Sequence, residues 1–197
     1  MQLLRLKIEQ TSSESIIRHG IDIIEVYLDR ASHASRNLMA VNKLNRAEFK
    51  RVDINTLLKD VVTGMAGVLE NAMLHYELSV DAYARGNYMA LKSCFTHILS
   101  NSIESMPEGR GMVTISTRPD GNKIRIDVVD TGCGISKECA QKVFEPCFTT
   151  KDKPDGLGLG LVVVHELISQ HNGEVEFYSS PGEGTRVTIV LPAGDEQ

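Results

Sequence analysis

The sequence predicts an α+β protein, a two-layer α/β sandwich in which helices cover one face of a mixed sheet, preceded by a long N-terminal helix. Two observations predict this class. Apolar residues at helical spacing alternate along the chain with runs in which every second residue is apolar. The expected order of elements in the larger part is helix, strand, helix, hairpin, helix, hairpin, which suits helices packed on one sheet.

A long helix is predicted over residues 12–46. Thr11-Ser-Ser-Glu14 has the form of a capping box, which favours a helix start near residue 12. Such a helix would leave its apolar stripe in water, so it needs a partner helix from this chain or another. Residues that follow at alternating steps of four and three form a heptad seam: Ile17, Ile21, Ile24, Leu28, Ala31, Ser35 and Leu38.

A strand, a helix, a strand and a helix are expected next. Residues 45–51 are polar and indicate a linker, and residues 49–54 predict a short strand that overlaps it. Asn55 is expected to cap the first helix, and Asn87 a second helix that ends near Ser105, before Pro107. The first helix would carry Leu58, Val61, Val62, Met65 and Leu69, and the alternating strand between the helices Tyr76, Leu78 and Val80.

The last third predicts two hairpins separated by a helix. The turn signal at 119–122 lies between two alternating runs, and the turn at 181–184 lies between strands at 175–179 and 185–191. Residues 161–171 predict a helix that is closed by Asn172-Gly173. Residues 131–160 are rich in glycine and show no clear periodicity.

The composition excludes several classes of protein. The 197 residues are 42% hydrophobic and carry a net charge of −5, which argues against nucleic acid or an anionic membrane as partner. No apolar run approaches the roughly 20 residues that span a bilayer, and residues 1–10 do not form a signal peptide. The four cysteines include no CxxC pair, so we expect the reduced thiols of a cytoplasmic protein rather than a zinc site.

A polar stripe lies on the helix predicted after Asn87. His97, Asn101 and Glu104 stand at i, i+4 and i+7 and therefore share one face. One explanation is plain solvent exposure. The other is a site, in which an asparagine oxygen suits Mg²⁺ and the histidine or glutamate accepts a proton.

Three glycine-rich turns follow. Asp130-Thr-Gly-Cys-Gly134 comes directly after an apolar strand, where it forms either a simple turn or a carboxylate at the floor of a pocket. The run 156–160 precedes a helix whose free N–H groups suit phosphate, yet it matches neither a P-loop nor a dinucleotide-binding motif. The turn 182–185 is by itself typical of a hairpin.

Together these motifs resemble the histidine-kinase branch of the ATPase family that also includes DNA gyrase, Hsp90 and MutL. Residues 97–104 are similar to the family's asparagine motif, and residues 130–134, 156–160 and 182–185 to its glycine motifs. Residues 144–151, Phe-Glu-Pro-Cys-Phe-Thr-Thr-Lys, are similar to the phenylalanine motif of its lid. The resemblance covers about residues 50–192 and implies the Bergerat-type ATP fold, with ATP and Mg²⁺ as cofactors.

The resemblance also implies roles for single residues. Asn101 would bind the Mg²⁺ that bridges the phosphates, and Asp130 would accept from the adenine amino group. His97 would help to position the γ-phosphate or relay a proton, and Glu104 is a second catalytic candidate whose alternative is a surface carboxylate. Phe144 and Phe148 would anchor the lid by packing. Further ATP-binding positions would be Gly132, Gly134, Ile135 and Thr185 near the base, and Lys151, Gly156, Leu157, Gly158, Leu159 and Gly160 near the phosphates.

The same resemblance divides the chain in two. Residues 1–48 would form part of a dimerisation helical hairpin, mainly its second helix, and residues 49–197 the ATP-binding catalytic domain. We expect a homodimer through the N-terminal helix and the receiver domain of a response regulator as partner. The family's phosphoacceptor motif, His-Glu/Asp-x-Arg/Lys-Asn-Pro, has no complete copy here, since His33-Ala-Ser-Arg-Asn37 lacks the acidic residue and the proline.

We therefore expect the catalytic domain of a two-component sensor histidine kinase that does not phosphorylate itself as this chain. Two alternatives stay open. One is an anti-sigma-type serine kinase, which has a related ATP domain. The other is a non-catalytic ATP-sensing interaction module, which the missing acceptor histidine would suit.

Overall fold

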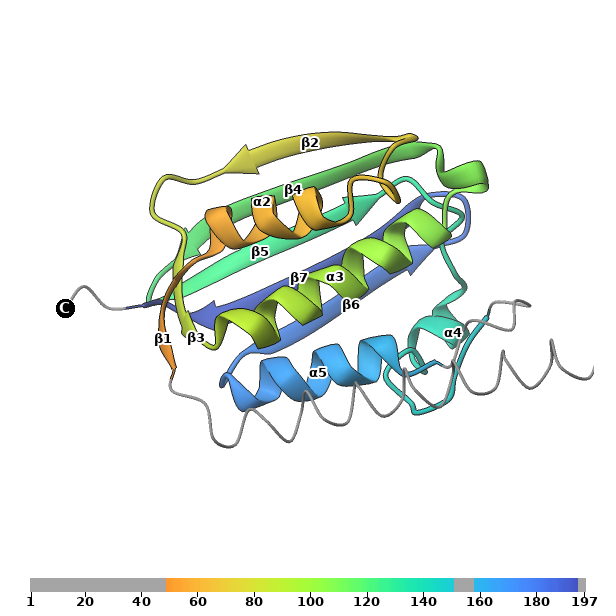
Figure 1. Ribbon diagram of the computed structural model, residues 1–197. Coiled ribbons are helices and arrows are strands. Elements are labelled where there is room, and N and C mark those ends of the chain that lie inside the picture. The colour runs from red at the N-terminus through yellow and green to blue at the C-terminus, as the bar shows by residue number, and fades with distance from the viewer. Residues whose placement is uncertain (1–48, 151–157, 195–197) are drawn as a thin grey trace, which may run out of the picture.

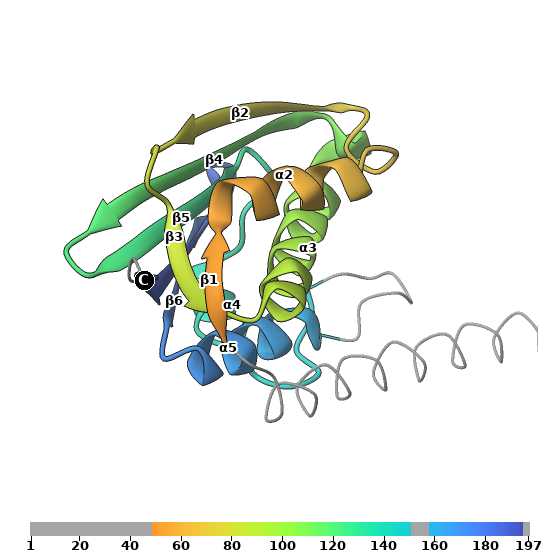
Figure 2. The same cartoon turned by 60° about the vertical axis from the view of Figure 1, so that its left-hand side comes forward.

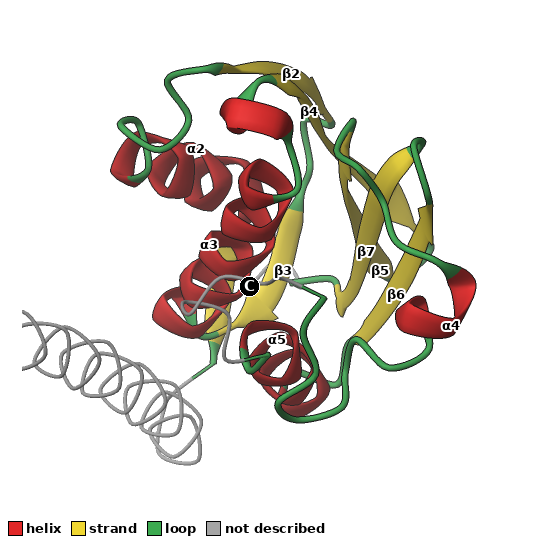
Figure 3. Ribbon diagram, turned by 90° about the vertical axis from the view of Figure 1, so that its right-hand side faces the viewer, coloured by secondary structure: helices red, strands yellow, loops and turns green. Residues whose placement is uncertain are grey.

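A computed structural model describes residues 49–150 and 158–194 of the chain. In this part, three helices lie on one face of a five-stranded sheet, as the sequence predicts (Figures 1 and 3). The long helix expected over 12–46 and the hairpin expected within 1–48 lie outside the described residues, as do Lys151, Gly156 and Leu157. None of the described helices is long and apolar enough to cross a membrane.

The sheet is mixed and places the two predicted hairpins side by side. In sheet order its strands are β2 (Ala72–Leu78), β4 (Gly111–Asp120), β5 (Lys123–Asp130), β7 (Gly184–Pro192) and β6 (Glu174–Ser180). The β2–β4 pair is parallel, and the other three pairs are antiparallel. Both predicted hairpins are therefore confirmed, and their pairing brings the end of β5 next to the start of β7.

Helix α3 (Tyr88–Glu104) lies between α2 (Ile54–Gly64) and α5 (Gly160–Gln170) and contacts both (Figure 1). Its apolar side packs on the inner face of the sheet, and burying each large side chain contributes about 1.5–3 kcal/mol. Asn87 caps it as predicted, since its Oδ1 accepts from the backbone N–H of Ala90 at 3.0 Å. The fully buried side chains at this layer boundary include Leu91, Phe95, Ile98, Ile115, Ile126 and Ile189.

The end of α5 is tied to the start of α3 by a buried histidine. Nδ1 of His171 lies 2.6 Å from the backbone oxygen of Leu167, and Nε2 accepts from the backbone N–H of Asn87 at 3.0 Å. The ring also stacks on Phe49, with ring centroids 4.6 Å apart. Asn172 follows at a φ of 54°, where the predicted end of the helix lies.

A second, two-stranded sheet closes one end of the helical layer. It pairs β1 (Lys50–Asp53) with β3 (Tyr83–Gly86) in antiparallel register, and Figure 2 shows the two strands side by side. β1 is the short strand that the sequence predicts. The prediction included neither β3 nor the single turn of helix α4 (Lys137–Ala140).

The cap of α2 lies two residues before the predicted one. Asp53 is the cap residue, and its Oδ1 accepts from the backbone N–H of Thr56 at 3.1 Å. Asn55 lies inside the helix because its amide reaches sideways to the sheet. Its Nδ2 donates to the backbone oxygen of Ser79 at 2.7 Å, and its Oδ1 accepts from Thr117 Oγ1 at 2.9 Å.

Two further element boundaries differ from the prediction. α2 ends at Gly64, so Met65 and Leu69 follow the helix, although both side chains are buried as expected. β2 ends at Leu78, and Val80 beyond it is 89% exposed rather than half-buried. In both places the apolar pattern of the sequence continues beyond the end of the helix or strand into the following turn.

Candidate functional site

Asp130 ends β5 at the rim of the sheet and is 4% exposed. Its Oδ1 accepts from the backbone N–H of Gly132 at 2.9 Å and from that of Thr185 at 3.2 Å. The hydroxyl of Ser105, at the end of α3, lies 3.3 Å from the same oxygen. The adjacent loop and two segments that are distant in sequence thus hold one carboxylate in a fixed orientation.

The electrostatics at Asp130 suit a carboxylate that accepts one further hydrogen bond. Burial raises the pKa of Asp130, and the hydrogen bonds from Gly132, Ser102, Thr185 and Ser105 lower it without cancelling the rise. Since a buried charge is costly unless it is hydrogen-bonded, a ligand donor at this carboxylate would be favourable.

The loop after Asp130 packs on the turn between β6 and β7. The backbone oxygen of Cys133 accepts from Gly182 N–H at 2.7 Å, and Cys133 N–H donates to the backbone oxygen of Ser105 at 2.9 Å. Gly134 has a φ of +61°, and a Cβ added there would lie 1.9 Å from the backbone oxygen of Ser180. The first and last glycine motifs therefore meet, and the close approach of two backbones requires glycine at 134.

The glycine at position 132 is required for a different reason. A Cβ added at Gly132 would lie 1.9 Å from Ser105 Oγ, the hydroxyl that contacts Asp130. Position 132 thus keeps the end of α3 and the end of β5 in contact. Ile135 completes the loop, and its N–H donates to Ser179 Oγ at 2.9 Å.

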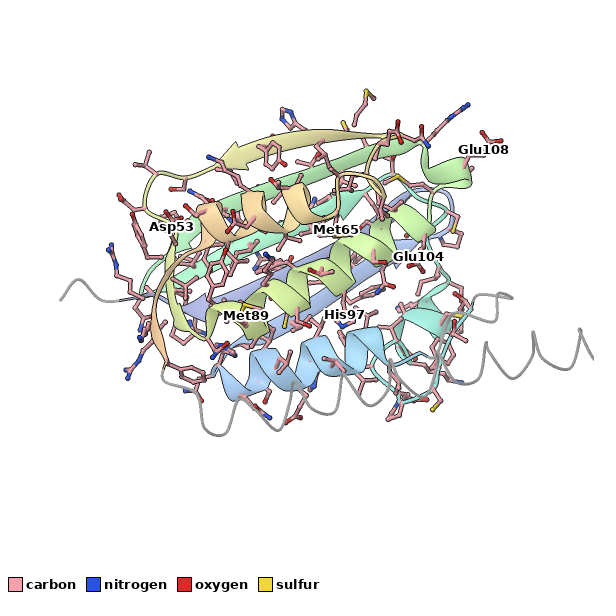
Figure 4. The ribbon with its side chains drawn as sticks, in the orientation of Figure 1. Asp53, Met65, Met89, His97, Glu104 and Glu108 are labelled. Carbon is pink, nitrogen blue, oxygen red and sulfur yellow. The ribbon has the colours of Figure 1, made fainter. Side chains whose placement is uncertain are left out.

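The polar stripe of α3 meets the start of α5. Figure 4 shows His97 between these two helices. A Cβ added at Gly160, the first residue of α5, would lie 3.6 Å from His97 Nδ1 and 4.0 Å from Asn101 Nδ2. Leu159 is the cap residue of α5 and uses no side-chain hydrogen bond for the cap. A helix N-terminus beside an imidazole and an amide is suited to an anion such as phosphate.

Glu104 stands apart from this junction. It is exposed at the last turn of α3, two helical turns beyond His97, and Figure 4 shows the two side chains at different places along the helix. Its Oε1 accepts from Ser100 Oγ at 2.7 Å, one turn back on the same helix. This setting is typical of the surface carboxylate that the sequence left open as an alternative.

The segment expected as the lid is anchored at its described end. The ring of Phe144 lies 5.3 Å from the ring of His165 on α5 and 6.3 Å from that of Phe177 on β6, centroid to centroid. Gly158 has a φ of +62°, and a Cβ added there would lie 2.3 Å from the backbone oxygen of Phe148. Packing of Phe144 against the domain is thus as predicted, and Phe148 contributes a close backbone contact.

Sequence reasoning missed three serines that shape this site. Ser102 and Ser105 hydrogen-bond around Asp130 from the end of α3, and Ser179 reaches the loop from β6. Isolated serines carry no spacing signal, so only their positions in space identify them. Among the described residues no group of three or more His, Cys, Asp or Glu side chains forms a candidate metal cluster.

Comparison with known proteins places this geometry among ATPases. Residues 86–195 match the family described as histidine kinase-, DNA gyrase B-, and HSP90-like ATPase. Sporulation kinase B of Bacillus subtilis is 34% identical over 168 residues, 84% of this chain and 39% of that protein. The histidine-protein kinase AtoS of Escherichia coli is 28% identical over 196 residues, 98% of this chain and 31% of that protein. The chain thus spans less than half the length of these curated relatives.

Solved structures agree with this placement. The catalytic domain of the histidine kinase ThkA has a TM-score of 0.67 and 25% identity, covering 75% of this chain and 97% of that one. Full-length ShkA, solved in complex with AMPPNP, has a TM-score of 0.69 at 23% identity and covers 81% of this chain and 35% of that one.

Proposed function

The chain belongs to the family of histidine kinase-, DNA gyrase B- and HSP90-like ATPases, and from this premise we propose that its site binds ATP with Mg²⁺ and directs the γ-phosphate to a histidine. Its fold and relatives are those of the catalytic ATPase domain of two-component sensor histidine kinases. The observation that carries the proposal is the buried carboxylate of Asp130, held between two glycine turns. The serine-kinase alternative and the non-catalytic module would use the same carboxylate, and the histidine kinases among the relatives favour the histidine-kinase hypothesis.

The base would bind at Asp130. The hydrogen bonds from Gly132, Thr185 and Ser105 end on Oδ1, and we propose that the carboxylate accepts from the adenine amino group through Oδ2. Gly132 and Gly134 would let the backbone approach the flat ring, and Ile135 and Thr185 would border it. This arrangement supports adenine recognition, because a carboxylate accepts from an amino group and repels the carbonyl oxygen that guanine carries at the same position.

The phosphates would bind between α3 and the start of α5. Asn101 offers a neutral amide oxygen, a hard donor of the kind that Mg²⁺ accepts when phosphate oxygens and water supply its other ligands. The N–H groups at Leu159 and Gly160 would face the phosphates. Lys151 and the glycine run from Gly156, with Leu157 and Gly158, are proposed to close over them.

The two catalytic candidates have different support. His97 lies at the junction that would hold the phosphates, so we propose that it positions the γ-phosphate or relays a proton. Glu104 is kept as a catalytic proposal with weaker support, since it is exposed two turns away. When bound, Mg²⁺ would neutralise charge on the phosphates, and the protein's part would be positioning.

The acceptor histidine is proposed to come from outside this chain. No complete acceptor motif occurs in the 197 residues, so we expect no self-phosphorylation. Residues 1–48 would contribute part of a dimerisation hairpin and so a homodimer, with residues 49–197 as the catalytic domain. A response regulator receiver domain is the proposed partner, since the kinase ThkA has been solved in complex with the response regulator TrrA. We propose that this domain works in the cytoplasm.

A phosphotransfer assay tests this function. The purified chain is incubated with radiolabelled ATP and Mg²⁺, alone and with a separately supplied dimeric hairpin that carries the acceptor motif. We expect acid-labile phosphate on the hairpin and none on the chain. Acid-stable phosphate would contradict histidine phosphorylation and favour a serine kinase, and acid-labile phosphate on His33 would contradict the missing acceptor.

A further inference from the structure

Ser179 lies on β6, is only 9% exposed and hydrogen-bonds to both loops that border Asp130. Its Oγ accepts from Ile135 N–H at 2.9 Å and lies 3.0 Å from the backbone oxygen of Gly184 and 3.0 Å from Thr185 Oγ1. One hydroxyl therefore contacts the loop after β5 and the first two residues of β7.

The hydrogen-bonding capacity of Ser179 is completely used by these contacts. A serine hydroxyl has one hydrogen to donate and two lone pairs to accept with. The carbonyl of Gly184 can only accept, so Ser179 donates to it. Ser179 then accepts from Ile135 N–H and from the hydroxyl of Thr185. This assignment fixes the direction of the Thr185 hydroxyl as well as its position.

Two partners of Ser179 belong to the segments around the carboxylate of Asp130, and one of them contacts it directly. Thr185 pairs with Ser179 across the β6–β7 hairpin and with Asp130 across β5–β7, and its N–H donates to Asp130 Oδ1. Ile135 ends the loop that begins at Asp130 and contains Gly132 and Gly134. Removing the Ser179 hydroxyl would remove the hydrogen bonds to Ile135 in this loop and to Thr185 on β7, while Asp130 itself stays unchanged.

We infer that Ser179 is a positioning residue for the nucleotide base: it holds Thr185 and Ile135 so that Asp130 presents its carboxylate to the exocyclic amino group of adenine. This inference rests on the proposed function. A residue that only stabilised the fold would weaken every nucleotide equally. A residue that positions the Asp130 carboxylate must instead weaken the discrimination between purines with and without that amino group.

The experiment compares two nucleotides on the full chain by calorimetric titration with Mg²⁺. One is ATP, and the other is purine riboside triphosphate, which lacks the 6-amino group. For Ser179→Ala we expect about a tenfold loss of ATP affinity, the effect of about one hydrogen bond, and less than about a threefold change for the analogue. Ser179→Thr, which keeps the hydroxyl, should retain the preference for ATP. Ser116→Ala on β4 is the matched control, because its side chain alternates to the opposite face from Ile115 and Thr117.

Each outcome decides the inference. Equal losses for both nucleotides in Ser179→Ala would show a merely structural serine and overturn it, as would unchanged ATP affinity. If Ser179→Ala does not fold, Ser179→Cys carries the same test, since its thiol is a weaker partner of similar size, and the same selective loss is required. A wild-type chain that binds both nucleotides equally well, or neither, would instead contradict the adenine site of the proposed function.

Discussion

The backbone N–H of Thr185, at the start of β7, donates to Oδ1 of Asp130, at the end of β5, over 3.2 Å. The two residues are direct partners in the pairing of these strands. The backbone of the sheet therefore helps to orient the carboxylate, together with Gly132 and Ser105.

Asp130→Asn should weaken ATP binding roughly 10- to 100-fold, because an amide N–H₂ would replace the oxygen that accepts from adenine. The hydrogen bond lost is a charged one, worth about 1.5–3 kcal/mol.

The free energy of unfolding of Asp130→Asn at pH 7 should stay the same as that of the wild type or rise. Burial raises the pKa of Asp130, so ionisation costs stability as pH rises through the folded-state value, and asparagine removes that cost. Titration calorimetry and urea denaturation measure the two effects, with exposed Asp120→Asn as control. Unchanged ATP affinity would rule out this carboxylate as the base-binding group.

Gly134→Ala should abolish nucleotide binding and destabilise the domain far more than Gly121→Ala. Both glycines have a φ of +61°, so each substitution carries the same backbone penalty, about 1–2 kcal/mol. Only at 134 would the new Cβ also meet a backbone oxygen at 1.9 Å, whereas nothing lies within 4 Å at 121. Thermal unfolding and ATP titration of both variants check this difference. Equal stability of the two variants would mean that the loop after Asp130 does not pack on the β6–β7 turn.

Asn101→Ala should remove the dependence of ATP binding on Mg²⁺. In the wild-type chain we expect at least about tenfold tighter binding with Mg²⁺ than with EDTA, equivalent to about 1.4 kcal/mol. The variant should bind ATP equally in both buffers, because its methyl group cannot ligate the ion. Asn122→Ala, in the exposed turn between β4 and β5, is the control. An Asn101→Ala chain that keeps the full effect of Mg²⁺ would place the ion elsewhere.

The free energy of unfolding should fall as pH drops below about 6.5, and His171 should account for part of that loss. Burial lowers the pKa of His171, although its hydrogen bond to Leu167 opposes the shift, so the unfolded chain binds a proton that the folded chain rejects. Stability is therefore complete above the unfolded pKa and is lost towards the folded one, by at most about 1.4 kcal/mol per pH unit.

Urea denaturation from pH 5 to 8 measures this slope. His171→Gln should flatten it, whereas His75→Gln should not, since the side chain of His75 is 58% exposed. A slope that is the same in wild type and His171→Gln would contradict a buried neutral imidazole that accepts from Asn87 N–H.

Much of the fold was predictable because its signals are local. The cap at Asn87, the two hairpins and the helix before Asn172 each depend on turn chemistry and alternation within a few residues, and all are confirmed. The errors arose where tertiary contacts decide. Asn55 has a good capping side chain, yet its amide is used by Ser79 and Thr117, and Asp53 takes the cap. The strand β3 has only four residues, and apolar and polar residues do not clearly alternate along it. It forms a strand because it pairs with β1, which the sequence pattern does not reveal.

The sequence motifs of the candidate site could be recognised in advance, but the hydrogen bonds that connect them could not. The glycine turns could be located from the sequence, and the structure brings the turn that contains Gly134 against the turn between β6 and β7. Their roles in ATP binding stay predictions. Ser105 and Ser179 could not be found, because the hydrogen bonds that give them a role join residues 25 and 44 positions apart. Glu104 shares a helix face with His97 in the sequence pattern, but seven residues of helix separate the two along the axis by about 10 Å.

Titration of the full wild-type chain with ATP and with GTP, each with Mg²⁺, tests the central claim most directly. A carboxylate that accepts from the adenine amino group predicts ATP binding with a Kd of roughly 1 μM to 1 mM and GTP binding at least about tenfold weaker. Binding of neither nucleotide, or equal affinity for both, would contradict a nucleotide site built on Asp130.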